Sequence, residues 1–115
     1  RFPFPHDSRL LRSTDFRRVY DEGFRVTGPL FTAFCRQTDG QAGSRVGFTV
    51  PRALGCAVAR NRIRRRMREA VRLRLALLPA GWQVVFNPRR GVLAAGFDVL
   101  GREVERVFER CAGRS

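Results

Sequence analysis

The sequence contains no lysine and offers few groups with which to perform catalysis by itself. All 23 basic residues are arginine, the only histidine is His6, and there are ten carboxylates. A protein nucleophile needs a nearby base and a third group that orients it, and the sequence offers no such set. Its carboxylates are scattered, suit caps and turns, and form no cluster able to hold magnesium. The sequence therefore argues against a nuclease that acts alone, and we expect no catalytic residue.

Cysteine and long apolar runs are also scarce. Cys35, Cys56 and Cys111 are widely separated and form no Cys-x-x-Cys pair, so we expect no metal or cofactor bound by the chain itself. We expect three reduced thiols in a cytoplasmic protein. No apolar run is long enough for a transmembrane segment, and none follows the N-terminus as in a signal peptide. The chain begins with Arg1 and not with methionine, which we take to indicate a trimmed N-terminus.

The charge of the chain indicates a polyanionic partner. The formal net charge is +13 and the sequence pI is near 11.7. Self-repulsion at that charge is hard to explain unless a polyanion neutralises it. A nucleic acid is one such polyanion, and an acidic membrane surface is the competing one. A chain of 115 residues suffices for one packed core, so we expect a single RNA-binding domain over 1–115.

Residues 55–72 carry most of the information about function. Apolar residues recur there at helical spacing, which predicts a helix from about Ala57 to Leu78 with one buried face. This apolar seam consists of Ile63, Met67, Ala70, Val71 and Leu78. At 100° per residue, the stripe about opposite the seam consists of Asn61, Arg65, Arg68 and Arg72.

The stripe has the chemistry of a phosphate-binding surface. Guanidinium groups bind phosphate oxygens through paired hydrogen bonds and stay charged at any working pH. The alternative is a basic face that is simply solvated, but such faces usually include acids, and this helix has only Glu69. We therefore interpret the stripe as an RNA-binding face.

The rest of the pattern predicts an α+β sandwich in which three helices pack on a small mixed sheet. Residues 1–8 contain two prolines and no periodicity, which indicates an extended N-terminal arm. The remaining predicted elements are a helix from Ser13 to Gly23, strand 24–37 with an interruption at Gly28-Pro29, strand 45–50, strand 82–87 and a helix from about 94 to Gly113. The order is α-β-β-(β)-α-β-α, and the general rule predicts a right-handed βαβ crossover.

Two parts of the sequence resemble the protein component of bacterial ribonuclease P. One is the strand sequence 45–50, followed by Gly-x-Ala-Val at 55–58, Arg-Asn-Arg at 60–62 and Ile-Arg-Arg at 63–65. The other is the N-terminal pattern Arg-Leu at 9–10, Asp-Phe at 15–16, Val-Tyr at 19–20 and Gly23. A lone Arg-Asn-Arg is a weak signal, whereas this order and spacing cover most of the chain.

The resemblance implies an accessory subunit of an RNA–protein endonuclease. Ribonuclease P is a hydrolase that removes the 5′ leader from precursor tRNA, and its RNA subunit holds the catalytic Mg²⁺ ions. The expected partners are therefore ribonuclease P RNA and the precursor leader, with no DNA and no membrane. The resemblance also implies a left-handed βαβ crossover, which we accept over the general right-handed expectation.

The resemblance implies two binding regions as well. The basic helix faces the catalytic RNA near the cleavage site, and the expected contacts are Arg52, Arg60, Asn61, Arg62, Arg64, Arg65, Arg68 and Arg72. A cleft between the first helix and the sheet receives the single-stranded leader, which favours aromatic side chains beside basic groups. The expected cleft residues are Phe16, Tyr20, Phe34 and Arg36, and the alternative is that these rings belong to the core. A tyrosine at a cleft keeps its hydroxyl in water, which favours Tyr20 as a cleft residue.

Two positions depart from the family pattern. Cys56 stands where asparagine is common, and Asn87-Pro88 stands where the strand usually ends with a basic residue, with Arg89 and Arg90 just beyond. One alternative function is a ribosomal-protein-like structural RNA-binding protein, which would bind folded RNA without affecting precursor cleavage. The other is a small nuclease, which would cleave precursor tRNA without an RNA subunit.

Overall fold

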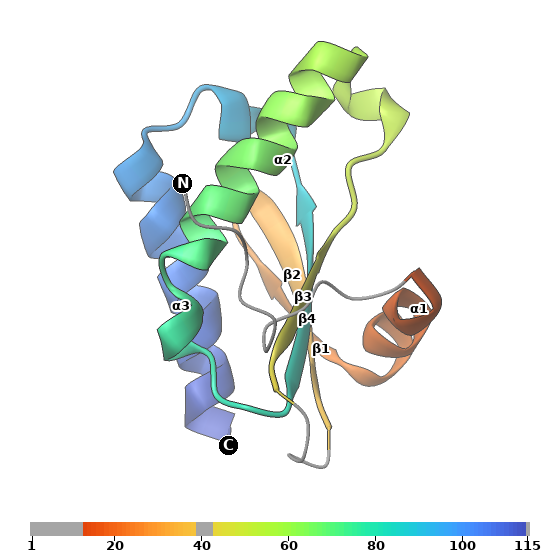
Figure 1. Ribbon diagram of the computed structural model, residues 1–115, viewed down its shortest axis with the longest axis vertical. Helices are drawn as coiled ribbons and strands as arrows, with labels where there is room; N and C mark the ends of the chain where they lie inside the picture. Colours follow the sequence, from red (N-terminus) through yellow and green to blue (C-terminus); the bar gives the residue numbers. More distant parts are fainter. Residues whose placement is uncertain (1–12, 39–42, 115) are drawn as a thin grey trace.

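A four-stranded sheet carries helices on both faces, with α2 and α3 on one side and α1 on the other (Figure 1). The computed structural model describes residues 13–38 and 43–114. The elements in chain order are α1 (Ser13–Glu22), β1 (Phe24–Thr27), β2 (Phe31–Gln37), β3 (Arg45–Phe48), η1 (Arg52–Leu54), α2 (Ala57–Arg72), η2 (Leu75–Leu77), β4 (Trp82–Pro88), η3 (Arg90–Leu93) and α3 (Phe97–Arg114). This order confirms the predicted α+β sandwich, while the arm predicted over 1–8 lies outside the described residues.

The sheet is mixed and contains one crossover. Its strand order is β1-β2-β4-β3, in which β1 pairs with β2 and β2 with β4 in antiparallel register. β3 and β4 are parallel, and α2 joins them. In Figure 1 the parallel strands β3 and β4 both run upward, β3 passes in front of β4, and α2 lies to their left, which makes the crossover left-handed. This is the sense that the family resemblance implies, and it departs from the general right-handed rule.

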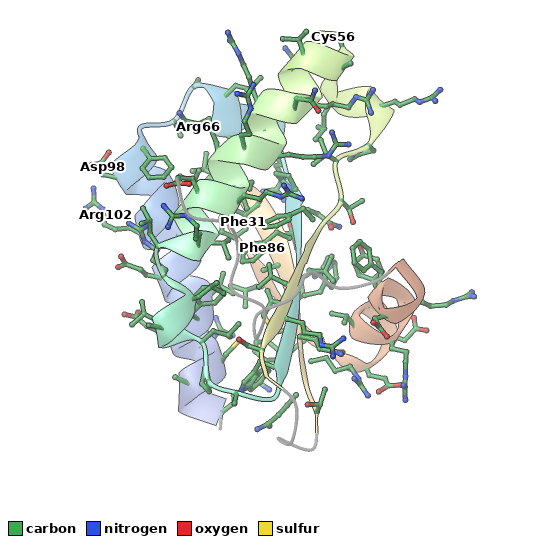
Figure 2. The ribbon with its side chains drawn as sticks, in the orientation of Figure 1. Phe31, Cys56, Arg66, Phe86, Asp98 and Arg102 are labelled. Atoms are coloured by element: carbon green, nitrogen blue, oxygen red, sulfur yellow. The ribbon has the colours of Figure 1, made fainter. Side chains whose placement is uncertain are left out.

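The main core lies between the sheet and the pair α2 and α3. Phe86 on β4 is fully buried, and its ring centroid lies 5.1 Å from Phe31, 5.9 Å from Phe48 and 6.1 Å from Phe108. Figure 2 shows Phe31 and Phe86 within this layer. The apolar seam of α2 faces the same core, because Ile63, Met67, Ala70 and Val71 are all buried. The seam predicted from the sequence is thus confirmed for α2, and it fixes which side of the helix meets solvent.

The opposite face of the sheet is covered by α1, a helix of 10 residues. Val19 of α1 and Val85 of β4 are buried against each other, and the half-buried rings of Phe16, Tyr20 and Phe34 pack around them. Around this small cluster the sheet presents half-buried polar side chains, including Gln83 and Asn87. Because α1 is short and is the helix that covers this face of the sheet, the face stays partly accessible.

The predicted boundary of α2 was wrong by six residues. The α-helix ends at Arg72 and not at Leu78, because Arg74 N–H bonds to Val71 O (2.9 Å) in a tighter turn. The η2 turn that follows returns Leu78 to the core, where it is 6 % exposed. Pro79, which cannot continue a helix, comes next. The predicted seam residue Leu78 is therefore buried, but from a turn and not from the helix.

Gly23 provides a stability test of the junction between α1 and the sheet. A Cβ at Gly23 would lie 2.5 Å from Cys35 O and 2.6 Å from Val19 O, both backbone atoms. We expect Gly23→Ala to lower the free energy of unfolding by about 1–3 kcal/mol, as overpacking does. The matched control is Gly113→Ala, where the added Cβ has no atom within 4 Å, and where stability should hold or rise slightly. Urea unfolding of both variants measures the difference, and equal stabilities would contradict this reading.

Candidate nucleic-acid interface

The exposed side of α2 carries a row of guanidinium groups. Asn61, Arg62, Arg65 and Arg68 are exposed, on the side away from the buried seam. Among the described residues, no carboxylate forms an ion pair with Arg62, Arg65 or Arg68. Their charge is therefore not neutralised by a carboxylate of the described residues. Three of the four residues of the predicted stripe, Asn61, Arg65 and Arg68, are thus exposed.

The remaining candidates on α2 are partly engaged within the protein. Arg72, the fourth member of the stripe, is half-buried and forms an ion pair with Glu69. Arg64 donates from Nη1 to Asn61 Oδ1 (3.0 Å), which orients the amide on the exposed face. Arg60 is half-buried, and its enclosed Nε has no hydrogen-bond partner among the described residues.

Arg66 is a structural residue that holds α2 against the segment before α3, and it is not part of the exposed stripe. Its Nε donates to Val92 O (2.9 Å), and its Nη2 donates to Ala95 O. Its guanidinium carbon also lies 5.9 Å from the ring centroid of Phe97. Figure 2 shows Arg66 beside the segment that leads into α3. One basic helix in the sequence thus contains two kinds of arginine, and the burial of individual side chains separates them.

The start of α2 is held by the η3 segment. Arg90 donates from Nη1 to Leu54 O (2.8 Å) across the turn that precedes the helix. Gly55 in that turn has φ +138°, and a Cβ there would lie 2.9 Å from Arg90 Nη1. This conformation and this contact both favour glycine. Arg52, the remaining predicted RNA contact, is exposed in η1 just before this turn.

Cys56 occupies the N-cap position of α2 and is exposed. The backbone N–H groups of Ala59 and Val58 lower the pKa of its thiol, since they favour the charged form. The departure from asparagine therefore leaves a thiol that ionises more readily at the start of the basic helix. Cys35 and Cys111 are instead buried, and the Cys35 pKa is raised by a hydrogen bond with Cys111 and by burial.

The aromatic residues predicted for the second region do come together on the α1 face. The rings of Tyr20 and Phe34 meet edge to face with centroids 4.7 Å apart, and Phe16 packs in the same cluster. The Tyr20 hydroxyl donates to Asn87 Oδ1 (3.0 Å) and lies 3.1 Å from Thr49 Oγ1. The hydroxyl that was expected to lie in water thus has two partners within the protein. Asn87, at a position that departs from the family pattern, anchors Tyr20 to the sheet.

Arg36 is more enclosed than the sequence indicated. Its Nε donates to Glu22 (2.8 Å) and its Nη1 to Gln83 (2.9 Å), and its side chain is 16 % exposed. The hydrogen bond from Arg36 is the main cause that lowers the pKa of the Glu22 carboxyl. Arg36 therefore ties the end of α1 to the sheet, and part of its charge is already neutralised.

Arg89 is the cation that sequence reasoning left out of this region. It is exposed just after β4, and it donates to Gly28 O and, from Nη2, to Thr32 Oγ1 (3.0 Å). Thr32 lies on the same face of β2 as Phe34, two residues away. The sequence did indicate a basic residue near the end of this strand, because Arg89 and Arg90 follow Asn87-Pro88. The basic charge of the strand end is displaced and not lost.

Two findings, on metal-ligating side chains and on membrane-spanning helices, hold for residues 13–38 and 43–114. No three His, Cys, Asp or Glu side chains gather there in a group that could hold a metal ion. No helix of that part of the chain is long and apolar enough to cross a membrane.

Comparison with known proteins agrees with this geometry. The ribonuclease P family model matches residues 4–112. The chain belongs to the ribonuclease P protein family. Membership makes it an accessory, RNA-binding subunit of the ribonuclease P endoribonuclease, and it favours this function over the ribosomal-protein-like alternative.

Individual relatives cover nearly the whole chain. It is 40 % identical over 107 residues to the ribonuclease P protein component of Acidothermus cellulolyticus, covering 92 % of this chain and 89 % of that protein. It is 49 % identical over 106 residues to that of Chloroflexus aurantiacus, covering 89 % and 76 %. The solved ribonuclease P protein of Thermotoga maritima superposes with a TM-score of 0.77 at 27 % identity, covering 88 % of this chain and 96 % of that one.

The division of the arginines can be tested by stability. Arg66→Ala removes charge-assisted hydrogen bonds to two backbone carbonyls. We expect it to lower the free energy of unfolding by about 1–3 kcal/mol. Arg65→Ala, one residue away and exposed, should change it by no more than about 0.5 kcal/mol. Urea unfolding at fixed salt measures both variants, and a larger loss for Arg65→Ala would show that the assignment is reversed.

Proposed function

We propose that the chain assists ribonuclease P RNA in removing the 5′ leader of precursor tRNA by means of two separate surfaces. In this proposal the exposed side of α2 binds the RNA subunit, and the α1 face of the sheet binds the leader. The observation that supports the proposal most directly is that the guanidinium stripe and the aromatic cluster lie on opposite sides of the sheet. The Mg²⁺ ions belong to the RNA subunit, and the proposed holoenzyme works in the cytoplasm.

The α2 surface suits a folded RNA with closely spaced phosphates. Arg62, Arg65 and Arg68 are exposed and without acidic partners in the described part of the chain. Because the buried seam and the contacts of Arg66 fix α2 on the sheet, these side chains start from a rigid base. Less binding energy is then lost to ordering the site when the RNA docks. Arg52, Arg60, Arg64 and Arg72 extend the proposed surface, although Arg72 must share its charge with Glu69.

The α1 face suits a single strand. Phe16, Tyr20 and Phe34 pack against Val19 and Val85 and are half-buried, so part of each side chain remains accessible. Bases stack on such rings with little regard to sequence. Arg89 lies just beyond the end of β4. There it can bind a phosphate of the RNA strand whose bases stack on the rings. Arg36 contributes by holding α1 in place and not as a free cation.

Reconstitution tests the function as a whole. The purified chain is added to a bacterial ribonuclease P RNA at low Mg²⁺, and cleavage of precursor tRNA is followed with and without each component. We expect cleavage only when the RNA subunit is present, with the chain increasing it. Cleavage by the chain alone would support the small-nuclease alternative, and no effect on cleavage would contradict the proposal.

The α2 surface can be tested by salt dependence. Replacing Arg65 and Arg68 together by alanine should weaken binding to ribonuclease P RNA and reduce the slope of log affinity against log salt. Each lost phosphate contact lowers that slope by about 0.7–0.9. The charge-matched control replaces Arg102 and Arg110 of α3, which are also exposed. An equal change of slope in the two double variants would show that only net charge matters.

The leader surface can be tested by leader length. Phe34→Ala should weaken holoenzyme binding to precursor with a leader of about eight nucleotides by roughly tenfold, which corresponds to about 1.4 kcal/mol. Precursor with a one-nucleotide leader should bind almost normally. Tyr20→Phe is the control, because it removes the hydrogen bonds to Asn87 and Thr49 but keeps the ring, and it should leave the length dependence intact. An equal loss for both leaders in Phe34→Ala would assign the ring to the core.

A further inference from the structure

An open pocket lies between α2 and η3. It has a volume of about 450 Å³ and is lined by Arg62, Arg65, Arg66 and Leu93. This size falls within the range of about 300–1,000 Å³ that is usual for small-molecule sites. Three guanidinium groups thus surround one apolar side chain in this pocket.

The pocket has one fixed wall. Arg66 is held by Val92 O and Ala95 O, so the side chain cannot swing out to solvent without losing both bonds. Val92 is fully buried, and Leu93, the next residue, is half-buried against the main core. The position of Leu93 relative to α2 is therefore set before any ligand binds. Arg62 and Arg65 are exposed on the other side and can adjust to a ligand.

The combination selects for an unpaired nucleotide. A duplex presents phosphates to a basic helix and gains nothing from an apolar wall. A nucleotide outside a helix offers a phosphate, which guanidinium forks bind in pairs, and a base, which packs on apolar and guanidinium planes. Arg66 uses two of its nitrogens for backbone carbonyls, and its planar group presents a face for stacking as well.

We propose that this pocket receives a single unpaired nucleotide of RNA, with its phosphate bound by Arg62 and Arg65 and its base against Leu93 and Arg66. The inference deepens the proposed function, since it requires that α2 faces RNA and adds the kind of nucleotide that is bound. The nucleotide comes from ribonuclease P RNA or from precursor tRNA, which present the same chemistry.

The decisive variant changes the apolar wall and leaves every charge in place. Leu93→Ala should weaken RNA binding about fivefold while the salt slope stays unchanged, because no phosphate contact is lost. Leu93→Met keeps the apolar volume and should bind as the unmodified chain does. The matched control is Leu77→Ala, a leucine that is 46 % exposed in η2 and does not line the pocket.

Nucleotide-resolution chemical probing identifies the ligand. The unmodified chain is added to ribonuclease P RNA alone and to precursor tRNA alone, and the RNA that gains one protected unpaired nucleotide is the source. We expect Leu93→Ala to lose that protection and Leu93→Met to retain it.

Three results would overturn the proposal. The first is that no unpaired nucleotide is protected by the unmodified chain in either RNA, a result that does not depend on the folding of any variant. The second is unchanged affinity and protection in Leu93→Ala, and the third is an equal loss in Leu77→Ala. If replacing Arg65 and Arg68 still reduces the salt slope in those cases, the proposed function stands and the pocket alone is excluded.

Discussion

The buried seam of α2 is the constraint that decides which side of this helix meets solvent. A helix with seven arginines in 16 residues has a strong tendency to remain solvated, and burial of Ile63, Met67, Ala70 and Val71 is what holds it on the sheet. Burial of one face decides the orientation of the other, so the exposed stripe is a consequence of core packing. The crossover from β3 to β4 adds a second restraint, because both ends of α2 continue into neighbouring strands.

The arginines of this chain fall into two groups. Those of one group have hydrogen-bond partners within the protein, and those of the other are exposed on α2. Arg66, Arg74 and Arg90 donate to backbone carbonyls, and Arg74 also pairs with Glu105. Guanidinium groups suit this structural use because they remain charged and carry five donors in a fixed plane. Arg62, Arg65 and Arg68 on the exposed side of α2 have no carboxylate partner among the described residues. Part of the positive charge is thus paired within the protein, and part of it is not.

The sequence predicted the order of elements, the seam and most of the stripe, since each depends on local periodicity. It mispredicted the end of α2, because helical spacing continues to Leu78 while the backbone changes to a tighter turn after Arg72. It also could not show that Arg36 bonds to Glu22 and Gln83, or that Tyr20 bonds to Asn87. These partners are 14, 47 and 67 residues apart, and no local pattern reports such contacts.

The Tyr20 hydrogen bonds give a structural role to Asn87, one of the two departures from the family pattern. A basic residue at the end of β4 would place its charge beside the aromatic cluster, whereas Asn87 accepts a bond from Tyr20 and fixes the ring. The positive charge at this end of β4 is instead that of Arg89, whose guanidinium donates to Gly28 O and Thr32 Oγ1. Ring and cation are thus both positioned by neutral partners on the sheet. The Asn87 amide therefore holds the Tyr20 hydroxyl at the sheet, while Arg89 keeps a cation next to the same end of β4.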